Sequence, residues 1–163
     1  MLIPALLAGC AAAPPRELPA YREVVDPAES ARPTAERILK HLSTGDIDAA
    51  AALSNAPERR AQVLREYRDS VGEVEFRRIF TQYASRPVAR EIAVGKRRVV
   101  MWDLDGPLGA QYFVRAGERF VLDDVPSEGR SDLRRLLNSF RQEARRRPDN
   151  YGPGPEFSSA GKD

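Results

Sequence analysis

The chain of 163 residues has a single cysteine, Cys10, and a single histidine, His41. One cysteine excludes an intrachain disulfide, a cysteine-rich metal site and a Cys-x-x-Cys redox pair, so the fold must be stabilised by packing. One histidine cannot supply a histidine-based metal site. The sequence also has no glycine-rich phosphate loop and no nucleophile elbow. We therefore expect neither a metal nor a cofactor.

Long hydrophobic runs and a strong net charge are also lacking. Beyond the short apolar start, no segment approaches the roughly 18 apolar residues that a membrane-spanning helix needs. The formal net charge is +2, which by itself is too small to imply a polyanionic partner. The chain is 42% hydrophobic and 31% charged, which suits one small domain with a core and polar ends.

Proline is unevenly distributed and marks the limits of the expected domain. Six of the 13 prolines lie at or before residue 33, and three lie between residues 148 and 155. The other four fall where we place element boundaries. The distribution predicts a folded region at 33–146, a semi-extended tether up to residue 32 and a disordered tail at 147–163.

The residues around Cys10 suggest a role for this lone thiol. Leu7, Ala8, Gly9 and Cys10 follow an apolar run and precede an Ala-Pro stretch. They resemble the lipobox of bacterial lipoproteins, although the apolar run is short and lacks a preceding Lys or Arg. In that family, residues 1–9 would be a signal peptide and Cys10 would become a lipidated N-terminus. The alternative is a cytosolic protein in which the motif is accidental.

The same resemblance predicts where the protein is held. Acyl chains on Cys10, palmitate among them, would anchor the protein to a membrane. Residue 11 is Ala rather than Asp, which under the sorting rule of the resembling lipoproteins implies the outer membrane. The tether at 10–32 would then hold the domain in the periplasm.

The first half of the folded region has apolar residues at helical spacing. Gly45 is expected to end the first helix and Asp46 to cap the second. Pro57 would open a third helix, and residues 74–85 would form a fourth. The stripes that predict these helices contain Ala35, Ile38, Leu39 and Leu42 in the first, Leu64, Tyr67 and Val71 in the third, and Phe76, Ile79, Phe80 and Tyr83 in the fourth.

After Pro87 the hydrophobic period changes to two. Residues 88–106 are expected to form two strands joined at Gly95, and residues 110–124 two more joined near Gly117. A last helix should begin near Ser131. Its apolar side would contain Leu133, Leu136, Leu137, Phe140 and Ala144. The result is an α+β fold with N-terminal helices packed on a four-stranded antiparallel meander and a C-terminal helix.

Two stretches carry a resemblance to a known fold. "ILKHLSTGDIDAAAALS" and "YFVRAGERFVLDDVP" resemble segments of the cystatin-like, nuclear-transport-factor-2-like domains found in many bacterial lipoproteins. The likeness covers residues 33–127. It implies a domain that binds a partner protein or a small apolar ligand. The alternative is an enzyme of the ketosteroid-isomerase-like or polyketide-cyclase-like type.

Such enzymes combine an acidic base with an oxyanion donor. Most of the acids here fall at expected turns. Asp103 would share a strand face with Met101, while Trp102 would lie on the other face, so one of the two faces should be solvent-exposed. We therefore expect no catalysis, and we name Trp102 and Tyr112 as the binding residues to test first. The residues that the enzyme alternative would use are Asp103, Asp105, Tyr112, Asp123, Asp124 and His41.

The C-terminal end is basic. Residues 130–147 contain seven arginines and two acids, a balance of +5. In a cytosolic protein this could be a nucleic-acid face. Behind an export signal it would favour anionic headgroups, or it could be only a solvated helix face. We expect no nucleic-acid partner.

Overall fold

The computed structural model describes residues 17–103, 109–125 and 129–146. Cys10 and Asp105 lie outside these residues, as does the tail at 147–163. The elements are β1 (Arg22–Glu23), a 3-10 helix η1 (Pro27–Glu29), α1 (Arg32–Ser43), α2 (Ile47–Ala51), α3 (Pro57–Val71), α4 (Glu73–Ala84), β2 (Val88–Val94), β3 (Arg97–Trp102), β4 (Gly109–Ala116), β5 (Arg119–Leu122) and α5 (Arg130–Arg146). The fold is α+β, as the sequence predicts.

The sheet has five antiparallel strands in the order β1-β2-β3-β4-β5. The hairpin between β2 and β3 turns at Gly95, whose φ is +56°, a backbone conformation that L side chains rarely adopt. The expected sheet of four strands is corrected to five. The added strand, β1, pairs Arg22 with Ala93 and Glu23 with Ile92 at the free edge of β2.

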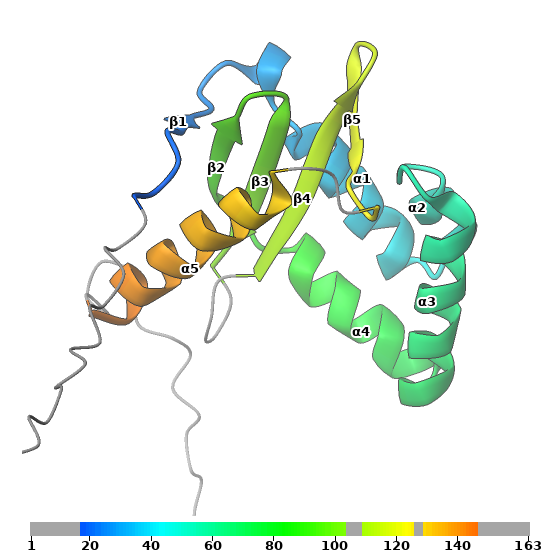
Figure 1. The fold of residues 1–163 in the computed structure, drawn as a ribbon. Coiled ribbons are helices and arrows are strands. Elements are labelled where there is room, and N and C mark those ends of the chain that lie inside the picture. The colour runs from blue at the N-terminus through cyan, green and yellow to red at the C-terminus, as the bar shows by residue number, and fades with distance from the viewer. Residues whose placement is uncertain (1–16, 104–108, 126–128, 147–163) are drawn as a thin grey trace, which may run out of the picture.

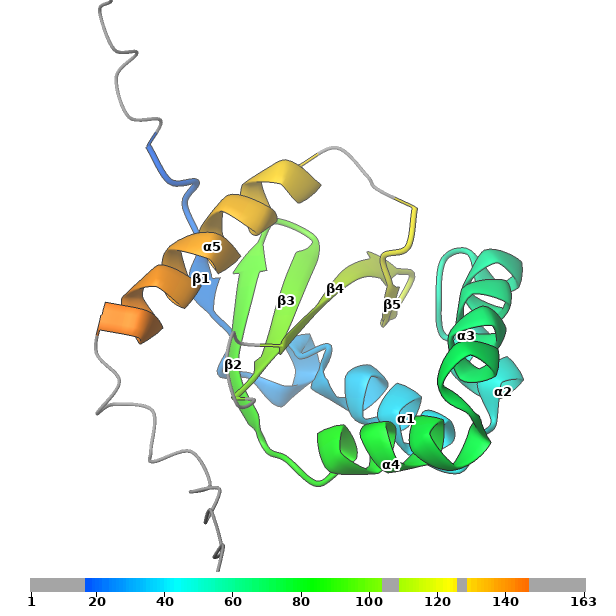
Figure 2. The same cartoon turned by 90° about the horizontal axis from the view of Figure 1, so that it is seen from below.

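Helices cover both faces of the sheet (Figures 1 and 2). The α1–α4 layer packs on one face, where Val100, Trp102 and Phe113 are buried. α5 packs on the opposite face, against Val99 and Met101. The protein therefore has three layers, with the sheet between two separate hydrophobic clusters.

This layering overturns the expectation that one face of the 99–104 strand meets solvent. Val99, Val100 and Met101 are 0% exposed, and Trp102 is 2% exposed. The side chains of β3 alternate between the two sheet faces as expected, but α5 covers the face that would otherwise be exposed to solvent. Helical periodicity predicts that the apolar side of α5 packs against another part of the fold, but it does not predict which part.

The helix stripes predicted from the sequence are largely confirmed. All four residues of the α1 stripe are buried. The Asp46 side chain accepts the backbone N–H of Ala49 at 3.1 Å, as a helix cap should. In α3, by contrast, Leu64 is buried but Tyr67 is 38% exposed. The buried residues of α5 are Leu133, Leu136, Leu137 and Phe140.

The segment just before α1 is attached to the sheet. The tether expected at 10–32 contains β1, η1 and Ala31, which is 0% exposed. Val24 adds a backbone hydrogen bond to the carbonyl of Glu91 at 3.0 Å. Proline content indicates an extended chain, but an extended chain can still pair with a sheet edge.

Candidate functional site

The two expected binding residues do not form one surface. Trp102 lies in the cluster between the sheet and α1–α4, so its ring is not available for surface contact. Tyr112 is half-buried against the α5 cluster on the opposite face. The guanidinium carbon of Arg130 lies 4.9 Å from the centroid of the Tyr112 ring, in a cation–π arrangement.

His41 and Asp103 occupy separate structural positions. His41 lies near the end of α1, and its Nδ1 is 3.7 Å from a carboxylate oxygen of Asp46. Asp103 is exposed at the end of β3, and its backbone carbonyl accepts a hydrogen bond from Arg86 at 3.3 Å. Both residues therefore belong to element ends rather than to a shared enclosure.

Asp124 anchors the end of β5 to the connection between α2 and α3. Its carboxylate accepts hydrogen bonds from the Ser54 hydroxyl and from the Arg60 guanidinium, whose Nε lies at 2.8 Å. The Asp124 side chain is 13% exposed and that of Arg60 is 28% exposed. This ion pair is therefore shielded from water more than a surface pair would be.

Asn55 extends this connection to Asp123. Its side-chain oxygen accepts the backbone N–H groups of Asp124 at 2.8 Å and Val125 at 3.1 Å. Its amide nitrogen donates to the carboxylate of Asp123 at 3.1 Å. Both acids thus have structural partners. The turn formers Ser54 and Asn55 before Pro57 were a usable sequence cue for a loop there, but not for its partner.

A second polar cluster joins the start of α1 to the sheet. Glu91 is 4% exposed and accepts hydrogen bonds from the Ser30 hydroxyl and from the backbone N–H of Ala31. Arg98 is 3% exposed and donates to the carbonyl oxygens of Glu29, Gly95 and Arg97 at 2.9–3.0 Å. Burial, together with the nearby charge of Arg22, lowers the pKa of Arg98. Nothing in the local sequence pattern distinguishes these two charges from exposed ones.

The outer face of α5 is polar and basic. Arg134, Arg145 and Arg146 are exposed, and none of them makes an ion pair within the described ranges. Arg135, by contrast, pairs with Asp132 at 2.6 Å. This face opposes the buried leucine stripe, so α5 has one side in the core and one side facing outward.

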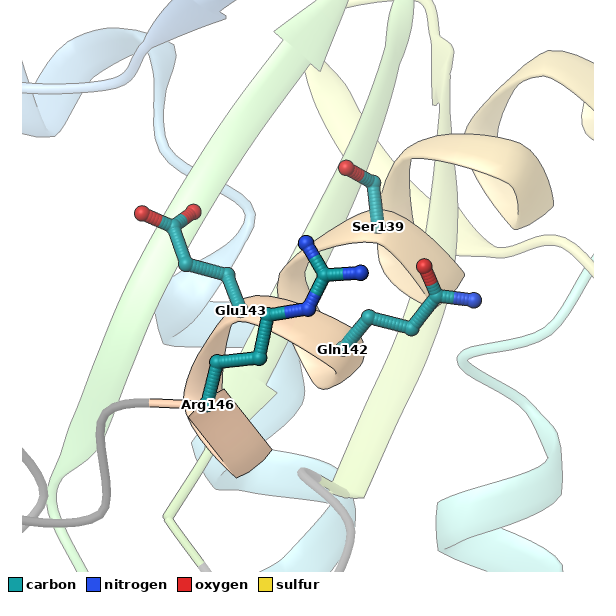
Figure 3. Close-up of a pocket in the computed structure, with 4 residues that line it drawn as sticks. All are labelled: Ser139, Gln142, Glu143 and Arg146. Carbon is teal, nitrogen blue, oxygen red and sulfur yellow. The ribbon is translucent and has the colours of Figure 1, made fainter.

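A shallow depression lies on the same helix. It is lined by Ser139, Gln142, Glu143 and Arg146, whose side chains all project from α5 (Figure 3). Their i, i+3, i+4, i+7 spacing places them on one helix face. The described residues that line the depression all belong to this one helix, and none of them is a residue that the enzyme alternative would use.

The N-terminal segment runs beside α5. Arg135 donates to the backbone carbonyl of Glu17 at 3.4 Å. The Tyr21 ring packs edge-on against Phe140, with the ring centroids 5.4 Å apart. Arg90 lies over the Phe140 ring at 3.9 Å. The described residues nearest to Cys10 in sequence, from Glu17 to Tyr21, are therefore held on the α5 side of the sheet, as Figure 2 shows.

Exposed apolar side chains also occur on α3 and at the start of α4. Val63 and Tyr67 lie one turn apart on α3 and are 49% and 38% exposed. Val74 at the start of α4 is 83% exposed. The Tyr67 ring also contacts Phe76, with ring centroids 6.0 Å apart. Tyr67 is thus an aromatic residue anchored on one side and open on the other.

Among the residues that the structure describes, no group of three His, Cys, Asp or Glu side chains could hold a metal ion. None of the helices in these ranges has both the length and the apolar character needed to cross a membrane.

Comparison with known proteins assigns no family. No protein-family model, no curated protein and no solved structure matches the chain.

Proposed function

We propose that this protein is a lipid-anchored component of the bacterial cell envelope, held in the outer membrane through acyl chains on Cys10 and facing the periplasm. The observation that carries the proposal is the Leu7–Cys10 motif, placed between an apolar run and a proline-rich stretch. The fold is compatible with it. Glu17 and Leu18 are exposed, so lipid attached seven residues before Glu17 would displace no core residue.

The domain itself is proposed to be of the cystatin-like, nuclear-transport-factor-2-like type. The order of four helices followed by antiparallel strands supports this assignment, as does the packing of α1–α4 on one sheet face. α5 on the opposite face is a departure from the resembling domains, which end at the last strand.

Such a domain would bind a partner protein or a small apolar ligand. Within this proposal, Tyr67 replaces Trp102 as the binding residue to test first. The Tyr67 ring is exposed, whereas the Trp102 ring is buried. Exposed aromatic side chains contribute disproportionately to contact energy at interfaces.

The alternative is a lipoprotein enzyme of the ketosteroid-isomerase-like type. That chemistry requires a base and an oxyanion donor within hydrogen-bond reach of one substrate. Asp123 is the most buried of the described candidate acids, but its carboxylate is bound by Asn55. Asp103 is exposed. No observation in the described residues favours this alternative over binding.

Mass spectrometry of the mature N-terminus tests the proposal. We expect a triacylated Cys10 at the N-terminus and no trace of residues 1–9. Because Cys10 is the only cysteine, loss of palmitate labelling in a Cys10→Ala variant assigns the site without ambiguity. An unmodified thiol in a chain that retains residues 1–9 would contradict the proposal.

A further inference from the structure

The outer face of α5 has the chemistry of a surface that binds anionic phosphate groups. Arg134 and Arg145 are 11 residues apart, which places them on the same side of the helix and about 16 Å apart along its axis. Arg146 follows on the same outward-facing arc. A guanidinium can form paired hydrogen bonds to phosphate oxygens. Arginines at this spacing can therefore contact separate headgroups.

The two acids of α5 do not cancel this charge. Asp132 is paired with Arg135. Glu143 is therefore the remaining acid of α5 beside the exposed guanidinium groups of Arg134, Arg145 and Arg146. The outward-facing side of the helix keeps an excess of positive charge.

The contact between Glu17 and α5, together with the number of residues back to Cys10, indicates which surface this face would meet. Seven peptide steps separate Cys10 from Glu17, and an extended chain of that length spans at most about 25 Å. α5 has 17 residues and is itself about 25 Å long. Because Glu17 contacts Arg135, a lipid on Cys10 would enter the membrane within about one helix length of this contact.

The opposite side of the molecule is less well placed. The α1–α4 layer lies across the sheet from α5 and from the N-terminal segment (Figures 1 and 2). A short tether that begins beside α5 brings the α5 side toward the bilayer first. Leu18, 49% exposed, and Tyr21, 42% exposed, add apolar groups on the segment that contacts α5 through Arg135 and Phe140. Exposed apolar groups on the same side as basic residues are typical of membrane interfaces.

We propose that the outer face of α5 lies on the anionic phospholipid headgroups of the membrane that holds the Cys10 anchor. This inference rests on the lipid anchor of the proposed function. The arginines would fix the orientation of the domain, with the α1–α4 layer and Tyr67 directed away from the membrane. The lipid supplies attachment, and α5 supplies the orientation.

Vesicle binding by the unlipidated full chain tests the contribution of α5 alone. The protein carries Cys10→Ala, and the vesicles are phosphatidylcholine alone or phosphatidylcholine with about one third phosphatidylglycerol. We expect sedimentation with the anionic vesicles only. Binding should disappear at high salt, because the Debye length falls to about 3 Å at 1 M.

Charge variants localise the interaction. Each arginine near an anionic surface contributes roughly a fivefold change in partitioning, so Arg134→Gln, Arg145→Gln and Arg146→Gln together should weaken binding by about a hundredfold. The matched control is Arg32→Gln, Arg37→Gln and Arg59→Gln, three exposed arginines of the α1–α4 layer. The control removes the same charge and should change binding by less than about fivefold. Circular dichroism of both variants verifies that they fold.

Three results would overturn the inference. The first is that the α5 triple variant and the control triple variant lose the same amount of affinity for anionic vesicles. The second is that the protein binds neutral vesicles as tightly as anionic ones. The third is that it binds a single-stranded oligonucleotide more tightly than anionic vesicles at the same salt concentration. The last result would favour a nucleic-acid face. Failure of the anchor itself is detected separately, by the mass of the native N-terminus. Vesicle binding and lipidation can thus succeed or fail independently.

Discussion

The carboxylate of Glu91, in β2, accepts the backbone N–H of Ala31 at 2.7 Å across 60 residues of chain. Both residues are buried, at 4% and 0% exposure. Ala31 is the N-cap of α1 and has no side-chain oxygen of its own to accept a helix N–H. A strand residue therefore supplies an acceptor at the start of the helix, and the sheet holds the point where the N-terminal segment enters the domain.

Replacing Glu91 with Ala should destabilise the protein. The change leaves the Ala31 N–H buried without this acceptor, and a lost partner of this kind costs about 1–3 kcal/mol. Urea unfolding of the variant measures the loss, and faster amide exchange at Ala31 would locate it. Glu36→Ala, at an exposed position of α1, is the control and should stay within about 0.5 kcal/mol of the parent.

Leu137→Ala tests whether α5 is part of the core. Leu137 is 2% exposed in the cluster with Ile92 and Met101. Truncation of a buried leucine costs about 2–5 kcal/mol, so the unfolding midpoint in urea should fall clearly. The neighbouring Asn138→Ala is the control, because Asn138 is exposed. A loss below about 0.5 kcal/mol for Leu137→Ala would show that α5 does not pack on the sheet in solution.

The Arg60–Asp124 pair should couple more strongly than a surface ion pair. A double-mutant cycle of Arg60→Gln and Asp124→Asn should give about 1–3 kcal/mol of coupling, because both groups share one network with Ser54. The comparison cycle uses Arg65 and Asp48, whose side chains are 48% and 77% exposed. Its coupling should be about 0–1 kcal/mol. Equal coupling energies in the two cycles would mean that the Arg60–Asp124 pair stabilises the fold no more than an exposed ion pair does.

Local periodicity predicts those parts of the fold that depend on a single element. The leucines of α5 are buried as their spacing requires, and Asp46 caps α2 as its position before the helix suggests. These features depend on residues within one or two turns of each other. A sequence pattern therefore contains the information needed to predict them.

Features that depend on several elements could not be predicted in this way. β1 has only two residues and exists because β2 offers a free edge. Trp102 and Met101 are both buried because helices arrive from opposite sides of the sheet. Glu91 and Arg98 have the sequence pattern of surface charges, and they are buried because the segment before α1 packs beside them.

The same distinction applies to the candidate site. Asp123 and Asp124 follow an expected strand, as the sequence indicates, but their partners Asn55 and Arg60 lie more than 60 residues earlier. Their structural role follows from tertiary contacts alone. The Cys10 motif, in contrast, is a linear feature, and any processing enzyme would recognise it before the domain folds.

Replacing Cys10 with Ala should move the protein out of the membrane fraction without unfolding the domain. The acyl chains on Cys10 are the proposed anchor, and α5 binding alone is salt-sensitive, so washed membranes should lose the variant. Fractionation by ultracentrifugation at high salt, with immunoblotting of each fraction, measures this change, and circular dichroism verifies the fold.

Ala11→Asp is the companion variant. It keeps the lipid but should shift the protein from the outer to the inner membrane in a density gradient, if the sorting rule of the resembling lipoproteins applies. Retention of Cys10→Ala in salt-washed membranes would refute the lipid anchor, whereas an unchanged position of Ala11→Asp would refute only the sorting prediction.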